Sequence, residues 1–270
     1  MSMAKGKPGS LGAVLGRWRI GVQSALLFAW LGPFGARMHG ACSPVFHCYS
    51  CPLATFSCPI GVLANFSALH LVPMIALGTL LVSGALFGSL ICGWACPFGF
   101  LQDLLGRIPA PKFALPSWTR YCRYAVLGGL VLAVPYLYGG DHPLFFCRVC
   151  PAGALEAAVP NAVSQAVNGE TIAWPSAAKL AILAGVIGLA VFSWRPWCTL
   201  FCPLGAIYGL FNRISFFFVR IRPEACNDCD LCRKLCRYRD ESERRAPADR
   251  CVRCLECSGC GAITIGTALK

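Results

Sequence analysis

Two runs of closely spaced cysteines near the C-terminus are the residues best suited to chemistry: Cys226-x2-Cys229-x2-Cys232-x3-Cys236 and Cys251-x2-Cys254-x2-Cys257-x2-Cys260. In bacterial two-cluster ferredoxins, three close thiolates and a remote fourth hold each [4Fe-4S] cubane. This rule predicts two cluster ligand sets, Cys226, Cys229, Cys232 with Cys260, and Cys251, Cys254, Cys257 with Cys236. Arg237 replaces the usual proline after the first run. Zinc is the alternative metal, because zinc ribbons also use Cys-x2-Cys pairs.

A second cysteine motif occurs twice along the chain. Cys96-Pro-Phe-Gly recurs 106 residues later as Cys202-Pro-Leu-Gly, and another cysteine, Cys92 or Cys198, stands four residues before each copy. One pair cannot complete a cubane, but two pairs brought together by the duplication can, so a third cluster is predicted here. The two sulfurs of a pair share one helical face if the helix continues through both cysteines, although the following proline favours a break. The alternative is four buried structural thiols.

A third group of cysteines lies in segments expected on the outer side of a membrane, opposite the inner motifs: Cys42, Cys48, Cys51, Cys58, Cys147 and Cys150. Cys58-Pro-Ile-Gly and Cys150-Pro-Ala-Gly form a matching pair of these outer motifs. A fourth cluster needs four thiolates, and the pattern favours Cys48 or Cys51 together with Cys58, Cys147 and Cys150. Disulfides are the alternative in an oxidising outer compartment.

The composition indicates that water is not the main solvent of most of the chain. Of 270 residues, 56% are hydrophobic and 13% are charged, and no Asp, Glu, Lys or Arg occurs from Met38 to Gln102. Because about 20 apolar residues suffice to cross a bilayer, we expect four transmembrane helices at residues 20–36, 69–90, 123–138 and 178–194. Lys and Arg concentrate before the first helix, after Pro97 and after Trp194. This asymmetry predicts a multi-pass inner-membrane protein with both termini in the cytoplasm.

The expected fold is an all-α membrane protein of four transmembrane helices in two similar halves, with a small C-terminal α+β two-[4Fe-4S] ferredoxin-like domain. The predicted domains are a basic tail at residues 1–19, the duplicated transmembrane part at 20–222 and the ferredoxin domain at 223–270. The net charge of +12 follows mainly from topology, and the Arg-rich stretch from Arg233 to Arg253 lies among cysteines whose negative charge it offsets. Nucleic acid is therefore not predicted as a partner.

With both inner motifs and the ferredoxin runs, the chain resembles the NapH/NosR-like membrane polyferredoxins. The resemblance implies a cytoplasmic ferredoxin domain, redox partners in a multisubunit complex, and electron exchange with the quinone pool or an outer redox partner. NapH-like members are regarded as quinol dehydrogenase subunits. The outer cysteines are not implied by this resemblance.

These observations predict an iron-sulfur electron-transfer subunit that passes electrons between the ferredoxin domain, the membrane clusters, and either quinone or a periplasmic carrier. Catalytic residues are not identified. Asp103, beside Cys96, is a candidate proton acceptor during quinol oxidation, or alternatively a solvated interfacial residue. The alternative function is a cysteine-rich metal-handling or redox-sensing membrane protein that assists assembly of a respiratory metalloenzyme.

Overall fold

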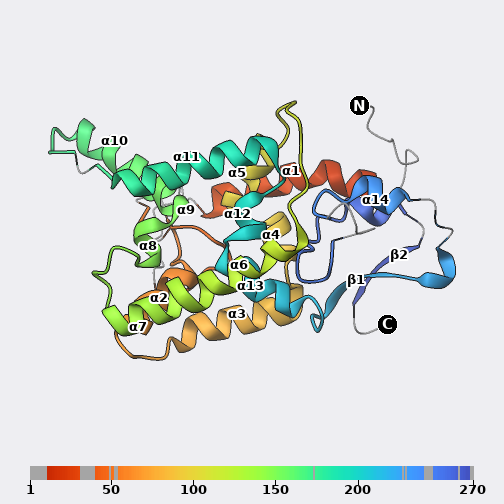
Figure 1. Cartoon of the computed structure of the whole chain (residues 1–270), viewed down its shortest axis with the longest axis horizontal. Helices are drawn as coiled ribbons and strands as arrows, with labels where there is room; N and C mark the ends of the chain where they lie inside the picture. Colours follow the sequence, from red (N-terminus) through yellow and green to blue (C-terminus); the bar gives the residue numbers. More distant parts are fainter. Residues whose placement is uncertain are drawn as a thin grey trace.

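Helices make up most of the described chain, and a two-stranded sheet lies at one end of it (Figure 1). The computed structural model describes residues 11–30, 40–48, 50–51, 54–172, 174–226, 228, 230–239, 246–260 and 262–267. Cys229, the tail at residues 1–10 and the end of the first expected span, residues 31–36, fall outside these ranges.

The helical body, residues 11–211, begins with α1 and the first repeated unit: α1 (Leu11–Trp30), α2 (Pro59–Ala68), α3 (Met74–Phe87), α4 (Leu90–Trp94) and α5 (Pro97–Leu105). A connecting helix then runs through four segments: η1 (Ser117–Tyr121), α6 (Cys122–Ala125), η2 (Val126–Ala133) and α7 (Val134–Tyr138). The second repeated unit contains α8 (Phe146–Val149), α9 (Pro151–Gly153), η3 (Ala154–Ala158), α10 (Val159–Val167), α11 (Ala177–Phe192), α12 (Pro196–Leu200) and α13 (Pro203–Phe211).

The two repeated units have the same order of elements. In each, a Cys-Pro motif opens a helix, a long apolar helix follows, a five-residue helix carries the first inner cysteine, and a second Cys-Pro motif opens the last helix. The inner pairs do not lie on one continuous helix, because α4 ends at Trp94 and Cys96 has extended backbone at the start of α5. The proline that follows removes a backbone N–H donor and favours this break.

The expectation of four transmembrane helices is wrong. Within the described residues, one helix, Trp118–Tyr138, is long and apolar enough to cross a membrane, by length and composition alone. Pro73 and Gly88, whose φ is +52°, limit α3 to 14 residues, about 21 Å of helix against a hydrocarbon core of about 30 Å. Similarly, α11 has 16 residues and ends at Ser193 in extended backbone. Turn residues therefore divide the apolar runs into shorter helices.

The sheet joins the C-terminal segment to the body. Strand β1 (Phe217–Ile221) pairs antiparallel with β2 (Ile263–Thr267), so that Phe217 lies opposite Thr267. Between them lie η4 (Pro223–Ala225), α14 (Leu231–Leu235) and η5 (Glu256–Gly259), and η5 contacts α1. Arg253 anchors this segment by donating hydrogen bonds to the carbonyls of Phe87 and Asn212.

Candidate iron-sulfur sites

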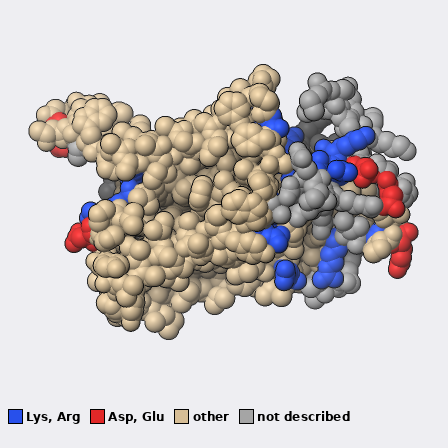
Figure 2. All heavy atoms as spheres, in the orientation of Figure 1, with Lys and Arg blue, Asp and Glu red and all other residues tan. Residues whose placement is uncertain are grey.

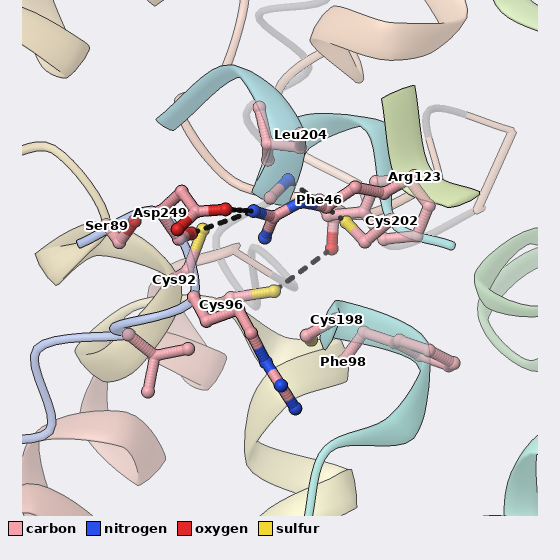
Figure 3. A pocket seen from close by; sticks show the side chains of 13 residues that line it. Phe46, Ser89, Cys92, Cys96, Phe98, Arg123, Cys198, Cys202, Leu204 and Asp249 are labelled. Carbon is pink, nitrogen blue, oxygen red and sulfur yellow. Dashed lines mark hydrogen bonds and ion pairs between the residues drawn. The ribbon is translucent and has the colours of Figure 1, made fainter. Parts of the chain in front are cut away.

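The four inner cysteines surround one cavity in the helical body. Cys92 comes from α4 and Cys198 from α12, whereas Cys96 and Cys202 immediately precede α5 and α13. Together they line one cavity (Figure 3), and each side chain is buried. Burial raises the pKa of the Cys202 thiol, and the nearby Cys198 and Cys92 thiols raise it further. The duplication thus brings two cysteine pairs from distant parts of the sequence to one place.

The second cysteine of each inner pair caps a helix N-terminus. Cys96 and Cys202 have nearly the same backbone angles, and the N–H of Gly99 or Gly205 donates to the sulfur at 3.4 Å in both copies. A Cβ on Gly99 would approach the carbonyl of Cys92 to 3.1 Å, so the glycine permits tight packing of the motif. Backbone N–H donors of this kind stabilise negative charge on a sulfur ligand.

A buried arginine lies on one side of the inner cysteines. Arg195 is fully buried with a left-handed φ of +49°, and it donates to the carbonyl of Cys92 and to both carboxylate oxygens of Asp103. Arg19 also donates to Asp103, at 2.5 Å. Burial alone would raise the pKa of Asp103, but the guanidiniums of Arg195 and Arg19 outweigh it and lower that pKa. Asp103 is therefore neither a solvated residue nor well suited to accept a proton; it orients Arg195.

A second buried arginine lines the inner cavity itself. Arg123 donates to the Asp249 carboxylate at 3.1 Å and to the Asp249 carbonyl at 3.0 Å (Figure 3). Burial raises the pKa of Cys92, and the positive charges of Arg123 and Arg195 oppose that rise. Sequence reasoning missed both roles, because Arg123 lies far from all four inner cysteines in the sequence, and Arg195, although three residues before Cys198, contacts Cys92, 103 residues away.

One side-chain amide contacts an inner sulfur directly. The Gln102 Nε2 donates to Cys198 Sγ at 3.3 Å, while its Oε1 accepts from the backbone N–H of Trp197 at 3.0 Å. Position 208, equivalent to 102 in the second copy, is a tyrosine whose hydroxyl donates to the carbonyl of Pro44 instead. The two halves therefore differ in the hydrogen bonds that they offer to sulfur.

A second cavity lies in the C-terminal segment. Its lining includes all four cysteines expected for one ferredoxin cluster: Cys236, Cys251, Cys254 and Cys257. The backbone N–H of Ala246 donates to Cys236 Sγ at 3.4 Å. Val252 lines both this cavity and the inner cavity, so the two cavities share part of their walls.

The two ferredoxin runs share an unusual backbone. Asp228 and Asp230 have left-handed φ values of +50° and +52°, and Arg253 and Leu255 occupy the corresponding positions with +50° and +63°. Such angles cost a non-glycine residue roughly 1–2 kcal/mol, so they mark loops held in a demanding conformation. In the first run, Cys232 lies close enough to Cys260 and Cys226 for these thiols to add to the rise in its pKa that burial causes. Cys229, the fourth member, lies outside the described residues.

Four outer cysteines also lie near one another: Cys48, Cys58, Cys147 and Cys150. Burial raises the pKa of Cys150, and the Cys58, Cys147 and Cys48 thiols raise it further. All four are free of disulfides in this structure. Within the described ranges, no three His, Cys, Asp or Glu side chains lie close enough to share a single metal ion. A cubane makes a different demand, because each thiolate binds a different iron.

Comparison with known proteins identifies two copies of one iron-sulfur unit. The family described as "4Fe-4S binding domain" matches residues 69–116 and 177–223, and each match contains one inner motif. The uncharacterized protein MJ0750 of Methanocaldococcus jannaschii is 29% identical over 182 residues, which cover 64% of this chain and 68% of that protein.

Two relatives with descriptive names extend this comparison. The putative electron transport protein YccM of Escherichia coli is 26% identical over 212 residues, covering 74% of this chain but only 54% of YccM. The regulatory protein NosR of Pseudomonas aeruginosa is 28% identical over 175 residues, 63% of this chain and 23% of NosR. No solved structure matches the chain.

Duplicated cysteine motifs on a helical body, joined to ferredoxin-type runs, define an iron-sulfur protein of the electron-transport class. The chain is similar to the NapH/NosR-like polyferredoxin-type electron transport proteins, which confirms the resemblance predicted from its motifs.

Proposed function

We propose that this protein is a membrane-bound electron-transfer subunit that holds one [4Fe-4S] cluster at the inner cysteines and two in the C-terminal ferredoxin domain, residues 223–270. The convergence of Cys92, Cys96, Cys198 and Cys202 on one cavity supports this proposal most directly. A cubane bound by four thiolates exchanges single electrons. The chain supplies the ligands, the surrounding charges and the route between the sites.

The inner cavity has the chemistry that an anionic cluster requires. Burying thiolates in apolar surroundings is unfavourable unless positive charge compensates, and structural thiols alone would need no such charge. Here Arg195 and Arg123 approach the cysteines from different elements, and each is held by a carboxylate, Asp103 or Asp249. These arrangements favour iron-sulfur ligation over four unmodified core cysteines.

The loop from Cys251 to Arg253 offers a short path between the ferredoxin domain and the inner site. Cys251 lines the ferredoxin cavity and Val252 lines both cavities. The loop is fixed to the body, because the indole N–H of Trp94 donates to the carbonyl of Arg253 at 3.1 Å. A Cβ on Gly93 would collide with the carbonyl of Val252, so the contact tolerates no larger residue. The two sites therefore keep a constant separation.

The surface of the helical body supports a location in the cytoplasmic membrane. Large apolar side chains are exposed along and around α3 and at the end of α7: Leu69, Leu71, Val72, Met74, Ile75, Leu81, Val82 and Leu137. An apolar surface of this extent is unusual on a monomeric soluble protein. Figure 2 shows a largely uncharged body, with most visible Lys and Arg at the end that carries the sheet. The positive-inside rule places that end in the cytoplasm.

In this proposal the protein works within a complex, exchanging electrons with the quinone pool or with a one-electron carrier at the outer face. The chain spans only 54% of YccM and 23% of NosR, so the proposal covers electron transfer and not the full activity of either relative. Because electrons would pass through the cluster held by the inner cysteines, electron transfer should require the two inner motifs whichever donor is used.

The test is the content of iron and acid-labile sulfide in the full chain purified anaerobically. Three clusters predict about 12 iron atoms per chain, and the double variant Cys92→Ser/Cys198→Ser should lose about four of them. Cys122→Ser is the matched control, because Cys122 lines neither cavity and should leave the iron content unchanged. Full iron in the double variant would refute the inner site. Zinc or copper in place of iron would favour the metal-handling alternative.

A further inference from the structure

We infer that Cys48, Cys58, Cys147 and Cys150 form an additional [4Fe-4S]-binding site at the end of the helical body that lies away from the sheet. Helices α2, α8 and α9 lie at that end (Figure 1). Iron binding at this site stands on the outer cysteines alone, whereas its part in electron transfer rests on the proposed function. The proposed site uses four of the six outer cysteines.

The outer site repeats the cysteine conformation of the inner site. Cys58 caps α2 and Cys150 caps α9, with φ and ψ of −73° and 125°, and −70° and 121°. The inner cysteine Cys96 has −73° and 120°. Unlike Cys96 and Cys202, Cys58 and Cys150 accept no hydrogen bond at sulfur from the first turn of the helix that they cap. A Cys-Pro-x-Gly element that presents sulfur at one site therefore presents it at both.

Cys48 is held against the second half of the chain by its backbone. The N–H of Cys48 donates to the buried carboxylate of Glu156 on η3 at 2.8 Å, although 108 residues separate them. A Cβ on Gly153 would lie 3.6 Å from Cys48 Sγ and 3.4 Å from Lys179 Nζ. The glycine therefore leaves room beside the sulfur, and Lys179 brings positive charge to the same place.

The remaining outer cysteines have different surroundings. Cys42 directs its thiol to the carbonyl of Ser57 at 3.7 Å. By contrast, Cys58 and Cys150 belong to one buried cluster, and Cys147 packs against that cluster. Cys48 is the fourth ligand, because its sulfur lies beside Gly153, three residues after Cys150, whereas the Cys42 thiol is directed to the carbonyl of Ser57.

Aromatic side chains connect the outer site to the inner one. Phe46 packs against Phe98, Phe146 and Trp197 with ring centroids 6.1–6.3 Å apart. Phe46 lines the inner cavity, its carbonyl accepts a hydrogen bond from Cys96 Sγ, and it lies two residues before Cys48. Phe146 directly precedes Cys147. Between the inner and outer cysteines the chain thus offers a path of two peptide units and a packed aromatic group.

This arrangement would let one electron pass between the two sites. When the inner site is oxidised by one electron, the outer site is reduced by one, and a one-electron carrier at the outer face then reoxidises it. No bond is formed or broken in the protein during this exchange.

The test compares matched variants of the full chain, purified anaerobically and measured for iron, sulfide and cluster signals by electron paramagnetic resonance. Cys58→Ser/Cys150→Ser should lose about four iron atoms from a total of about 16, and Cys42→Ser should lose none. Full iron in the outer double variant would refute the inference, and so would equal loss in Cys42→Ser. If the inner variant Cys92→Ser/Cys198→Ser keeps its iron while the outer variant loses four, the proposed function fails and this inference survives.

A second measurement uses the unmodified protein, because the outer variant could fold poorly. Alkylation followed by peptide mapping should find Cys48 and Cys147 protected in the iron-loaded protein and labelled after iron removal. Cys42 should be labelled to the same extent in both states. Labelling of Cys48 and Cys147 in the iron-loaded protein would refute the site, as would resistance to alkylation after iron removal that only a disulfide reductant relieves.

Discussion

Replacing Gln102 with leucine should lower the reduction potential of the inner cluster. The amide Nε2 donates to Cys198 Sγ at 3.3 Å, and the residue is 1% exposed, so water cannot replace this donor. Reduction adds negative charge that spreads onto the sulfur ligands, and a donor stabilises the reduced state more than the oxidised state. Leucine has a similar volume and no donor.

The size of the effect follows from the energy of one hydrogen bond. A hydrogen bond to a charged group contributes about 1.5–3 kcal/mol, and we take the difference between the two redox states as about 1 kcal/mol. For a one-electron couple, a tenfold change in the equilibrium, about 1.4 kcal/mol, corresponds to about 59 mV. We therefore expect the midpoint potential to fall by about 40 mV.

The duplication provides the control for this experiment. Tyr208 occupies the equivalent position in the second half, is equally buried, and donates to the Pro44 carbonyl at 2.7 Å rather than to sulfur. Tyr208→Phe should leave the potential within about 10 mV of the original, on the same hydrogen-bond scale. Gln102 also accepts from the Trp197 N–H, so the iron content of both variants must match that of the unmodified protein.

The assay is a redox titration followed by electron paramagnetic resonance on the full chain. An unchanged or raised potential in Gln102→Leu, with all iron retained, would refute the idea that this amide raises the reduction potential of the inner cluster. An equal fall in Tyr208→Phe would attribute the change to loosened packing.

Three further outcomes follow from the same contacts. Arg195→Met leaves Asp103 buried with less positive charge, so the free energy of unfolding should fall by about 3–5 kcal/mol, and the double variant Arg195→Met/Asp103→Leu should recover part of it in chemical denaturation. Gly93→Ala should push the Val252 loop off the body and slow electron transfer between the ferredoxin and inner clusters in flash-reduction kinetics; Gly21→Ala, whose Cβ meets nothing within 4 Å, should not. Anaerobic removal of iron should lower the unfolding temperature, because metal binding contributes to folding, and calorimetry before and after chelation would detect a failure of that coupling.

The meeting of Cys236, Cys251, Cys254 and Cys257 in one cavity could be predicted from sequence, because the spacing of three of these cysteines is local. Cys251, Cys254 and Cys257 lie within seven residues, so a short loop brings them together whatever the rest of the chain does. Placing Cys236 in the same cavity required only the general two-cluster rule. The meeting of Cys92 with Cys198 was likewise accessible, because the repeat implies a symmetric arrangement.

The helix count was not accessible from hydropathy. A charge-free run predicts burial or lipid contact, but Pro73 and Gly88 decide where a helix begins and ends within it. The roles of Arg195 and Gln102 were hidden for another reason: each contacts a cysteine about 100 residues away, and no local pattern marks such a partner. Arg19 and Arg123 illustrate the same limit, since composition places arginines at the membrane interface, whereas both are buried against carboxylates.

One local element accounts for much of the arrangement of the cysteines. Each of Cys58, Cys96, Cys150 and Cys202 precedes a proline that begins a helix, so the sulfur lies at the positive end of a helix, and in Cys96 and Cys202 it accepts a hydrogen bond from an N–H group of the first turn. Each half of the chain contributes one such cysteine to the inner group and one to the outer group. Duplication of a unit with a Cys-Pro element at both ends of its long helix therefore produces two symmetric four-cysteine groups, one at each end. In the function that we propose, single-electron exchange along the helical body would need this separation, which a single unduplicated unit, with half of each ligand set, would not provide.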